Sequence, residues 1–395
     1  MDKKAFLKYQ YPLAQFLYWV TCCSCSGFVA VYLQYKGFSN TVIGTVVGIY
    51  GVLSLIIQPV SSKIIHKVSF LTVRKMLLCM LFITGILFLI ISIWKSAGLL
   101  TICIFIVINA LNSSMIPLMS SFGMEYVNQK CDVNFGVARG IGSLGWAVSA
   151  VFIGILLEKY SPELLGYIYV LSAGIMFVNV LFMEDLGHVT EPSKIQEKEG
   201  GLLFKCLKDT IFLMVALGIL LDNISHAICT TYTINIVQSV GGSESAAGLA
   251  QFFGAGSEMI GMVIFAMLIR KYSSIQVLKI SSVFFAIRFL FLIFAGNLPM
   301  VMVGYALQGP SAGFYIPAAV YFVNDRMKPW NRTQGQAIFN VLTSGMANFI
   351  GNVIGGRLID QLGLRYTLIS CFIFAAVGCI FICGCSFGTN RHKAV

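Results

Sequence analysis

The amino-acid sequence predicts an all-α membrane protein in which twelve transmembrane helices form two bundles of six. Of the 395 residues, 57% are hydrophobic and only 11% are charged, and the mean hydropathy is +0.84. This composition is far more apolar than that of a soluble globular protein. Many apolar runs reach about 20 residues, the length that crosses a hydrocarbon core about 30 Å thick. One long polar segment divides the runs into two sets of six, and no room is left for a soluble domain.

The chain begins with a short basic arm, MDKKAFLKYQ, and the apolar run after it is longer than the core of a signal peptide. Because this run shows no convincing cleavage site, we expect it to be retained as the first helix. Apolar length and periodicity place the twelve spans at roughly 10–35, 41–65, 72–94, 98–124, 135–157, 164–183, 210–237, 246–269, 275–295, 298–323, 333–358 and 364–386.

The polar segment between the two sets runs from Glu184 to Asp209 and is rich in charged residues. This composition is typical of a linker. The expected domains are an N-terminal six-helix bundle at 1–184, a cytoplasmic linker at 185–209 and a C-terminal six-helix bundle at 210–395. Two such bundles around a central substrate path are a recurrent plan of membrane transporters.

Basic residues are distributed unevenly between the two sides of the predicted membrane. With the N-terminus inside, 20 of the 27 lysines and arginines fall on the cytoplasmic side and 5 on the outer side. The sequence therefore predicts a multi-pass protein of the cell (inner) membrane with both termini cytoplasmic. Topology also explains the net charge of +11, so we expect no nucleic-acid partner. Cysteines lie within apolar runs without paired CxxC motifs, so no metal, cofactor or disulfide is expected.

Arg139 is a single cation inside the otherwise apolar span 135–157. A lone charge near the bilayer centre costs several kcal/mol, so the guanidinium must either face a polar cavity or extend to the lipid headgroups. Ser143 and Trp146 lie four and seven residues further on and share its helix face. An indole beside an arginine suits a ring-shaped polar ligand. We therefore expect Arg139 and Trp146 to bind substrate, with the headgroup contact as the alternative.

Glu258 lies about twelve residues from either end of its span, too far for a short carboxylate to reach water by snorkelling. Intramembrane ionisable groups usually mark substrate or ion paths, so Glu258 is predicted to serve both substrate binding and proton coupling. The alternative is a protonated carboxyl that only joins two helices.

Further ionisable residues are predicted to take part in proton coupling. Asp222 and His226 are four residues apart and therefore share a face, where they could pass protons or fix a helix pair. Arg288 could neutralise Glu258 or Asp222 from the neighbouring helix, or snorkel outward. Glu125 is a less buried reserve.

A polar stripe follows the span 333–358 at intervals of four residues, and it should not face lipid. It either lines an aqueous cavity, which we expect, or bonds to neighbouring helices. Its members are Gln336, Asn340, Ser344, Asn348, Asn352 and Gly356, of which Asn340, Ser344 and Asn348 are predicted to bind substrate.

The segment FGVARGIGSLGWAVSAVFIGI closely resembles the fifth helix of the lactose permease type, in the oligosaccharide:proton symporter branch of the major facilitator superfamily. The stretch Val52–Pro59 also has the spacing of that family. The resemblance implies a major facilitator fold. It implies that Arg139 and Glu258 match the sugar-binding arginine and glutamate and Trp146 the sugar-stacking tryptophan. It further implies that Asp222 and Arg288 match charged residues of helices 7 and 9.

Several family positions carry other residues in this chain. Ser121 stands in place of an acidic sugar ligand on helix 4, and Ala312 and Tyr315 replace the histidine and glutamate of helix 10. Ser344 replaces a lysine of helix 11, and the loop after helix 2 lacks the usual aspartate. Because the family's proton route is absent, coupling is expected to fall on Asp222 with His226, or on Glu258.

The sequence thus predicts a secondary active transporter that moves a small polar, sugar-like solute by alternating access, coupled to protons. The expected protein is a monomer whose partners are the solute, protons and the lipid bilayer. The alternatives are a permease for aromatic acids or nucleosides and a non-transporting membrane sensor. An enzyme is not expected, because no HExxH, GxSxG or P-loop motif occurs.

Overall fold

The computed structural model describes residues 3–68, 70–94, 98–185, 187, 206–328 and 331–385, and within these ranges the secondary structure is helical, without strands. The first group of helices comprises α1 (Lys3–Cys22), the π-helical turn η1 (Cys23–Gly27), α2 (Val29–Tyr35), α3 (Asn40–Lys67), α4 (Val73–Ile93), α5 (Leu99–Asn128), α6 (Phe135–Lys159) and α7 (Leu164–Phe182). The second group comprises α9 (Thr210–Thr231), α10 (Thr233–Gln238), α11 (Glu244–Leu268), α12 (Ser274–Ile293), α13 (Leu298–Ala306), the π turn η2 (Gly309–Gly313), α14 (Phe314–Arg326), α15 (Arg332–Asn340), the π turn η4 (Val341–Gly345), α16 (Met346–Leu362) and α17 (Leu364–Cys383).

Ten helices of the described chain are long and apolar enough to cross a membrane, and eleven if the bent pair Phe6–Gly27 and Val29–Tyr35 is one span. The predicted span 298–323 appears instead as α13, η2 and α14, each shorter than a full crossing. Pro310 lies in η2 and has no N–H to donate, which explains the break. The all-α membrane fold is confirmed, and the count of twelve spans stays a prediction.

Polar side chains mark the helix starts, as the sequence requires of segments with unpaired N–H groups. Ser39, Thr72, Asn134 and Asn297 accept hydrogen bonds from backbone N–H groups in the first turns of α3, α4, α6 and α13. Ser273 forms a capping box at the start of α12. These caps explain why each apolar run becomes helical where it does.

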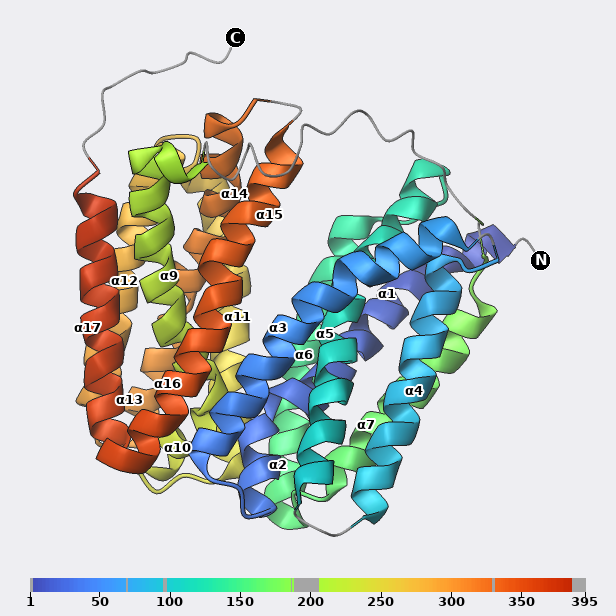
Figure 1. The fold of residues 1–395 in the computed structure, drawn as a ribbon, viewed down its shortest axis with the longest axis horizontal. Coiled ribbons are helices and arrows are strands. Elements are labelled where there is room, and N and C mark those ends of the chain that lie inside the picture. Colours follow the sequence, from blue (N-terminus) through green and yellow to red (C-terminus); the bar gives the residue numbers. More distant parts are fainter. Residues whose placement is uncertain are drawn as a thin grey trace.

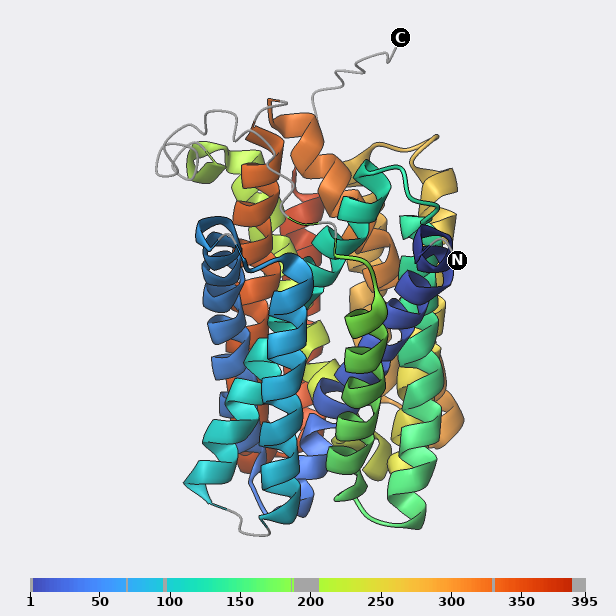
Figure 2. The same cartoon turned by 90° about the vertical axis from the view of Figure 1, so that its right-hand side faces the viewer.

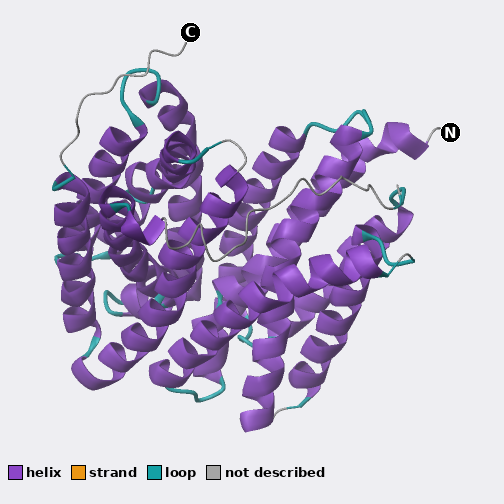
Figure 3. Cartoon of the chain, turned by 45° about the horizontal axis from the view of Figure 1, so that its top comes forward, coloured by secondary structure: helices purple, strands orange, loops and turns teal. Residues whose placement is uncertain are grey.

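The two groups of helices stand side by side (Figure 1), with α1 to α7 in one and α9 to α17 in the other. The long helices of both groups lie along broadly the same axis (Figure 2), and the described loops between them are short (Figure 3). This arrangement agrees with the expected bundles, whose boundaries stay a prediction. Of the predicted linker 185–209, residue 186 and residues 188–205 lie outside the described residues.

Helices of the two groups pack closely at α3 against α16 and at α6 against α11. A Cβ on Gly44 of α3 would overlap the carbonyl oxygen of Asn352, and a Cβ on Gly248 of α11 would overlap that of Ala150. Glycine therefore permits backbone contact between the groups at both crossings. We call the end of the molecule formed by α2, the start of α3 and the end of α16 the closed end.

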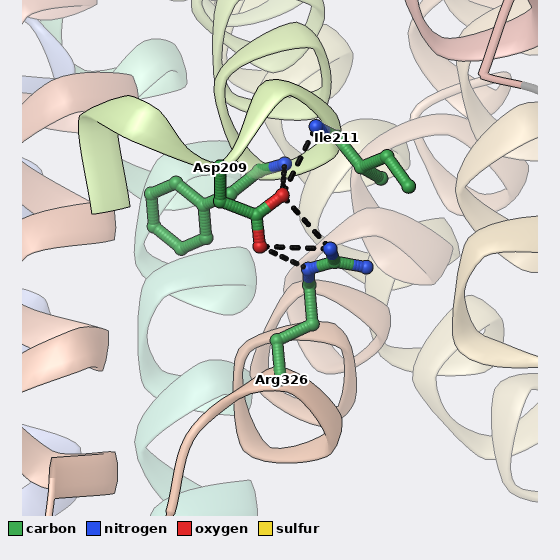
Figure 4. A network of polar contacts seen from close by, with 4 residues as sticks. Asp209, Ile211 and Arg326 are labelled. Atoms are coloured by element: carbon green, nitrogen blue, oxygen red, sulfur yellow. Dashed lines mark hydrogen bonds and ion pairs between the residues drawn. The ribbon is translucent and has the colours of Figure 1, made fainter. Parts of the chain in front are cut away.

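The opposite end carries the start of α9 and the end of α14. Asp209 accepts hydrogen bonds from the backbone N–H groups of Ile211 and Phe212, both at 3.1 Å, and so caps α9. The same carboxylate forms an ion pair with Arg326, with a shortest distance of 2.7 Å (Figure 4). In the first group, the Thr72 hydroxyl donates to Asp185 at 2.9 Å. Both described ends of the predicted linker are thus attached to their own group of helices.

Candidate substrate site

A cavity of about 960 Å³ lies between the two groups of helices. This volume is at the upper end of the range for small-molecule pockets. Four of the predicted site residues line it: Arg139, Trp146, Glu258 and Asn348. The structure therefore brings the deep charge of each half to one cavity.

Arg139 of α6 lies on the wall formed by the first group. Its guanidinium Nη1 donates to the Ser143 hydroxyl at 3.1 Å, and its Cζ lies 4.4 Å from the ring centroid of Trp19 on α1. Trp19 in turn meets Trp146 edge to face, with 6.0 Å between ring centroids and 71° between planes. Arg139 thus faces the cavity as expected, over an indole that sequence reasoning missed. A tryptophan within an apolar span gives no signal by itself, because aromatic residues are common in such helices.

Glu258 of α11 lies on the opposite wall and belongs to a hydrogen-bonded chain. Its Oε2 accepts from Gln308 Nε2 at 2.7 Å, and Gln308 Oε1 accepts from Arg288 Nη2 at 3.1 Å. Arg288 Nη1 lies 3.0 Å from His226 Nδ1. The guanidinium can only donate, so the Gln308 oxygen must face Arg288 and its nitrogen must face Glu258. The chain connects the cavity with the interior of the second group.

Arg288 is fully buried, so of the two alternatives considered for it, outward snorkelling is wrong. Its polar partners on α9 are His226 and the Cys229 sulfur, the latter at 3.4 Å. Of the two carboxylates considered for it, Glu258 is reached through Gln308. Gln308 was missed because it is a neutral residue of the broken segment 298–326.

Asp222 is buried and accepts a hydrogen bond from the Ser282 hydroxyl at 2.6 Å. Its other oxygen, Oδ1, has no hydrogen-bond partner among the described residues. Asp222 and His226 lie one turn apart on α9, yet each turns to a different residue of α12, Ser282 for the carboxylate and Arg288 for the imidazole. The two predicted coupling residues therefore belong to separate polar contacts, and neither lines the cavity.

The residues of the polar stripe in the eleventh predicted span differ in their surroundings, because one lines the cavity and others do not. Asn348 lines the cavity, whereas the Ser344 hydroxyl lies 3.3 Å from that of Tyr315 and 3.4 Å from the amide nitrogen of Asn223. Asn340 is exposed and lies outside the cavity lining. The π turn η4 separates Asn340 from Asn348, and its wider turn rotates residues spaced by four off a common face.

Two further residues complete the description of the polar groups. Glu125 is half-buried near the end of α5 and outside the cavity lining. Gln251 of α11 lines the cavity and donates through Nε2 to the Gly27 carbonyl of the other group at 2.8 Å. Its Oε1 is buried and has no hydrogen-bond partner among the described residues. No group of His, Cys, Asp or Glu suited to hold a metal ion occurs in the described part of the chain.

The fold and the central cavity define a membrane transporter. The model of the MFS_1 like family matches residues 8–370, so the chain belongs to this family and to the major facilitator superfamily. The superfamily predicted from the span 135–157 is thereby confirmed. The chain is a multi-pass membrane protein, and its family and structural neighbours are transporters and not enzymes.

Two relatives share extended sequence similarity with the chain. The maltose permease of Geobacillus stearothermophilus is 24% identical over 374 residues, which cover 91% of this chain and 90% of the permease. The uncharacterized transporter YwbF of Bacillus subtilis (strain 168) is 23% identical over 256 residues, 65% of this chain and 63% of that protein.

Solved structures share the fold at low identity. A mutant of the nucleoside transporter NupG superposes with a TM-score of 0.82 at 15% identity, covering 96% of this chain and 98% of that one. A bacterial homolog of the human lysosomal transporter Spinster, inward-facing and unoccupied, gives a TM-score of 0.69 at 13% identity, covering 97% and 96%. These similarities describe the fold alone.

Proposed function

We propose that this transporter carries a small, polar, sugar-like solute by alternating access and couples its movement to protons. The observation that carries the proposal is the convergence of Arg139 and Glu258, from opposite groups of helices, on one cavity with two indoles. The guanidinium offers hydrogen-bond donors and the carboxylate offers acceptors, which suits a ligand rich in hydroxyl groups. The Trp146 indole suits the apolar face of a sugar ring. Similarity to a maltose permease supports the same substrate class.

A nucleoside is the second candidate substrate. Trp146 at the cavity offers an aromatic ring for a base, and the fold neighbour NupG is a nucleoside transporter. An aromatic acid would instead place its carboxylate on Arg139. A sensor that binds without solute flux is separated from all of these by vesicle assays.

We propose the orientation that the basic residues favour, with both termini cytoplasmic and the protein in the cell membrane as a monomer. In that orientation the closed end, opposite the start of α1 and the end of α17 (Figure 1), faces outward, and the structure represents an inward-facing state. Tags at either terminus should then be unreactive from outside intact cells.

We propose that Glu258, or Asp222 supported by His226, carries the coupled proton. Arg288 is proposed as a charge partner of the carboxylate, and Glu125 as a less buried reserve. Glu258 is supported by its position at the cavity and by the chain through Gln308 to Arg288 and His226. Asp222 is supported by burial with one unpartnered oxygen, a group that can hold a proton. If Asp222 or Glu258 carries the proton, Asp222→Asn or Glu258→Gln, respectively, should keep counterflow exchange and abolish uphill uptake.

The substrate proposal is tested by thermal-shift titration of the purified protein with maltose, sucrose, uridine and benzoate, because a ligand stabilises the form that binds it. The solute that stabilises the wild type should lose its effect in Arg139→Ala and in Glu258→Ala. Arg357→Ala, an exposed arginine outside the cavity, is the matched control and should keep it. If both cavity variants stay folded and bind as the wild type does, the site assignment is wrong.

A further inference from the structure

Arg139 has an unusual set of partners for a cation inside a transmembrane helix. Among the described residues, it donates a hydrogen bond to the Ser143 hydroxyl and forms a cation–π contact with the Trp19 ring. Among the described residues it forms no ion pair with a carboxylate. In the described part of the chain, the guanidinium is therefore held in the cavity without a carboxylate in direct contact.

Trp19 is itself fixed by its surroundings. A Cβ on Gly142 of α6 would overlap Trp19 Cδ1, so the absence of a side chain there makes room for the indole. Tyr18 meets the indole edge to face at 5.6 Å and 73°, and the Tyr18 hydroxyl donates to the Asn112 carbonyl at 2.8 Å. With Trp146 on a further side, the ring has little freedom to move.

We propose that Trp19 is a positioning residue that holds the Arg139 guanidinium ready for ligand. The ring face attracts the cation through its quadrupole, and the guanidinium plane stacks better on it than an ammonium would. One N–H of the guanidinium is used by Ser143, which leaves other donors for a ligand. Because no carboxylate of the described residues lies within ion-pair distance of Arg139, a ligand does not have to displace one from the guanidinium. This inference rests on the proposed role of Arg139 in binding.

Four variants separate positioning from general packing. Trp19→Leu removes the aromatic face, and Trp19→Phe keeps it on a smaller ring. Gly142→Ala adds one methyl where the indole lies, whereas Gly140→Ala adds the same methyl on the same helix where a Cβ would meet nothing within 4 Å. The last two variants form a matched pair, because both glycines lie in α6 and both substitutions add one methyl group.

The first measurement needs no ligand. Phenylglyoxal modifies accessible guanidinium groups, and peptide mass spectrometry gives the rate at Arg139 relative to the exposed Arg357 in the same molecule. Release from the ring should raise the relative rate at least threefold in Trp19→Leu and in Gly142→Ala. Trp19→Phe and Gly140→Ala should stay within twofold of the wild type. Equal rates in all five proteins would overturn the proposal.

The second measurement is the apparent Kd for maltose and for uridine, with unfolding midpoints to verify the fold. A solute that binds the wild type should bind Trp19→Leu at least tenfold more weakly, with Trp19→Phe recovering most of the loss. If Arg139→Ala abolishes binding while Trp19→Leu binds normally, the positioning role is wrong and the proposed site stands. If the Arg139 modification rate depends on Trp19 while Arg139→Ala binds normally, positioning holds and the proposed site fails. Should Trp19→Leu not fold, Trp19→Phe and the glycine pair decide the question.

Discussion

Two aspartates cap helices at opposite ends of the molecule, and they differ in whose helix they cap. Asp209 accepts from the first N–H groups of α9, in its own group of helices, and pairs with Arg326 of the same group. Asp360, near the end of α16, accepts from the first N–H groups of α3, in the other group. The distances to the backbone nitrogens of Asn40 and Thr41 are 3.2 and 2.7 Å, and both side chains donate to the same carboxylate.

The chemistry of the two caps is the same, because both supply an anion to unpaired N–H groups at a positive helix end. The two caps differ in whether they can persist when the two groups of helices move relative to each other. A bond within one group can persist through a transport cycle in which the groups move as bodies. A bond between groups must break whenever the closed end opens. In the proposed alternating-access cycle, the position of a cap therefore indicates which contacts belong to one state.

The largest effect is expected where backbone meets backbone between the groups. In Gly44→Val the new side chain would overlap the Asn352 carbonyl and the Tyr232 hydroxyl, so the closed end cannot form as it is. Overpacking costs about 3 kcal/mol, which corresponds to a roughly hundredfold shift away from the closed state. Amide hydrogen exchange at the start of α3 should rise accordingly. Gly51→Val, on the same helix with open space around its Cβ, should leave exchange unchanged, and equal behaviour of the two variants would contradict the comparison.

The second effect concerns the polar chain of the cavity wall, which lies within one group. Gln308→Leu removes the hydrogen-bond partner of Glu258 and one of the partners of Arg288, which keeps His226 and Cys229, at a cost of about 2 kcal/mol. The unfolding midpoint should fall, while exchange at the start of α3 should stay as in the wild type. The exposed Gln129→Leu is the control for the substitution itself. A change in amide exchange at α3 would mean that the hydrogen bonds of Gln308 are also coupled to the closed end.

The charged residues of this site could be predicted from the sequence, because a charged residue inside an apolar run is unusual and can be recognised without knowledge of the fold. Arg139 and Glu258 were predicted in this way, and they lie on one cavity. Trp19 and Gln308 were not, because an aromatic or an amide inside a helix is ordinary until its neighbour is known. The helices themselves follow from apolar length and from caps such as Ser39 and Ser273, which are local signals.

Contacts between segments that lie far apart in the sequence could not be predicted from the sequence. Asp360 caps a helix that begins 320 residues earlier, and no local pattern records that pairing. The π turn Val341–Gly345 is a second case, because it alters the helical repeat within a span whose sequence fits a regular helix. It explains why regular spacing predicted a common face for Asn340 and Asn348, of which only Asn348 lines the cavity.

The third effect isolates the cap between the groups. Asp360→Ala removes the acceptor of four hydrogen bonds at an exposed position, and loss of a helix cap costs about 1 kcal/mol. Exchange of the Asn40 and Thr41 amides should rise roughly fivefold. Asp360→Asn keeps an acceptor without the charge and should fall between the alanine variant and the wild type. If Asp360→Ala exchanges as the wild type does, the cap does not contribute to closure.

The smallest effect belongs to the ion pair at the opposite end. The Arg326 and Asp209 side chains are 25% and 34% exposed, so solvent screens their attraction, and pairs of this kind contribute at most about 1 kcal/mol. Arg326→Ala removes the pair while Asp209 can still cap α9 through its bonds to Ile211 and Phe212. We therefore expect a slight fall in the unfolding midpoint and unchanged amide exchange at Asn40 and Thr41. Because the pair lies within one group, raised exchange at α3 in Arg326→Ala would show that the two ends are coupled through the bundle, and the distinction between the two caps would fail.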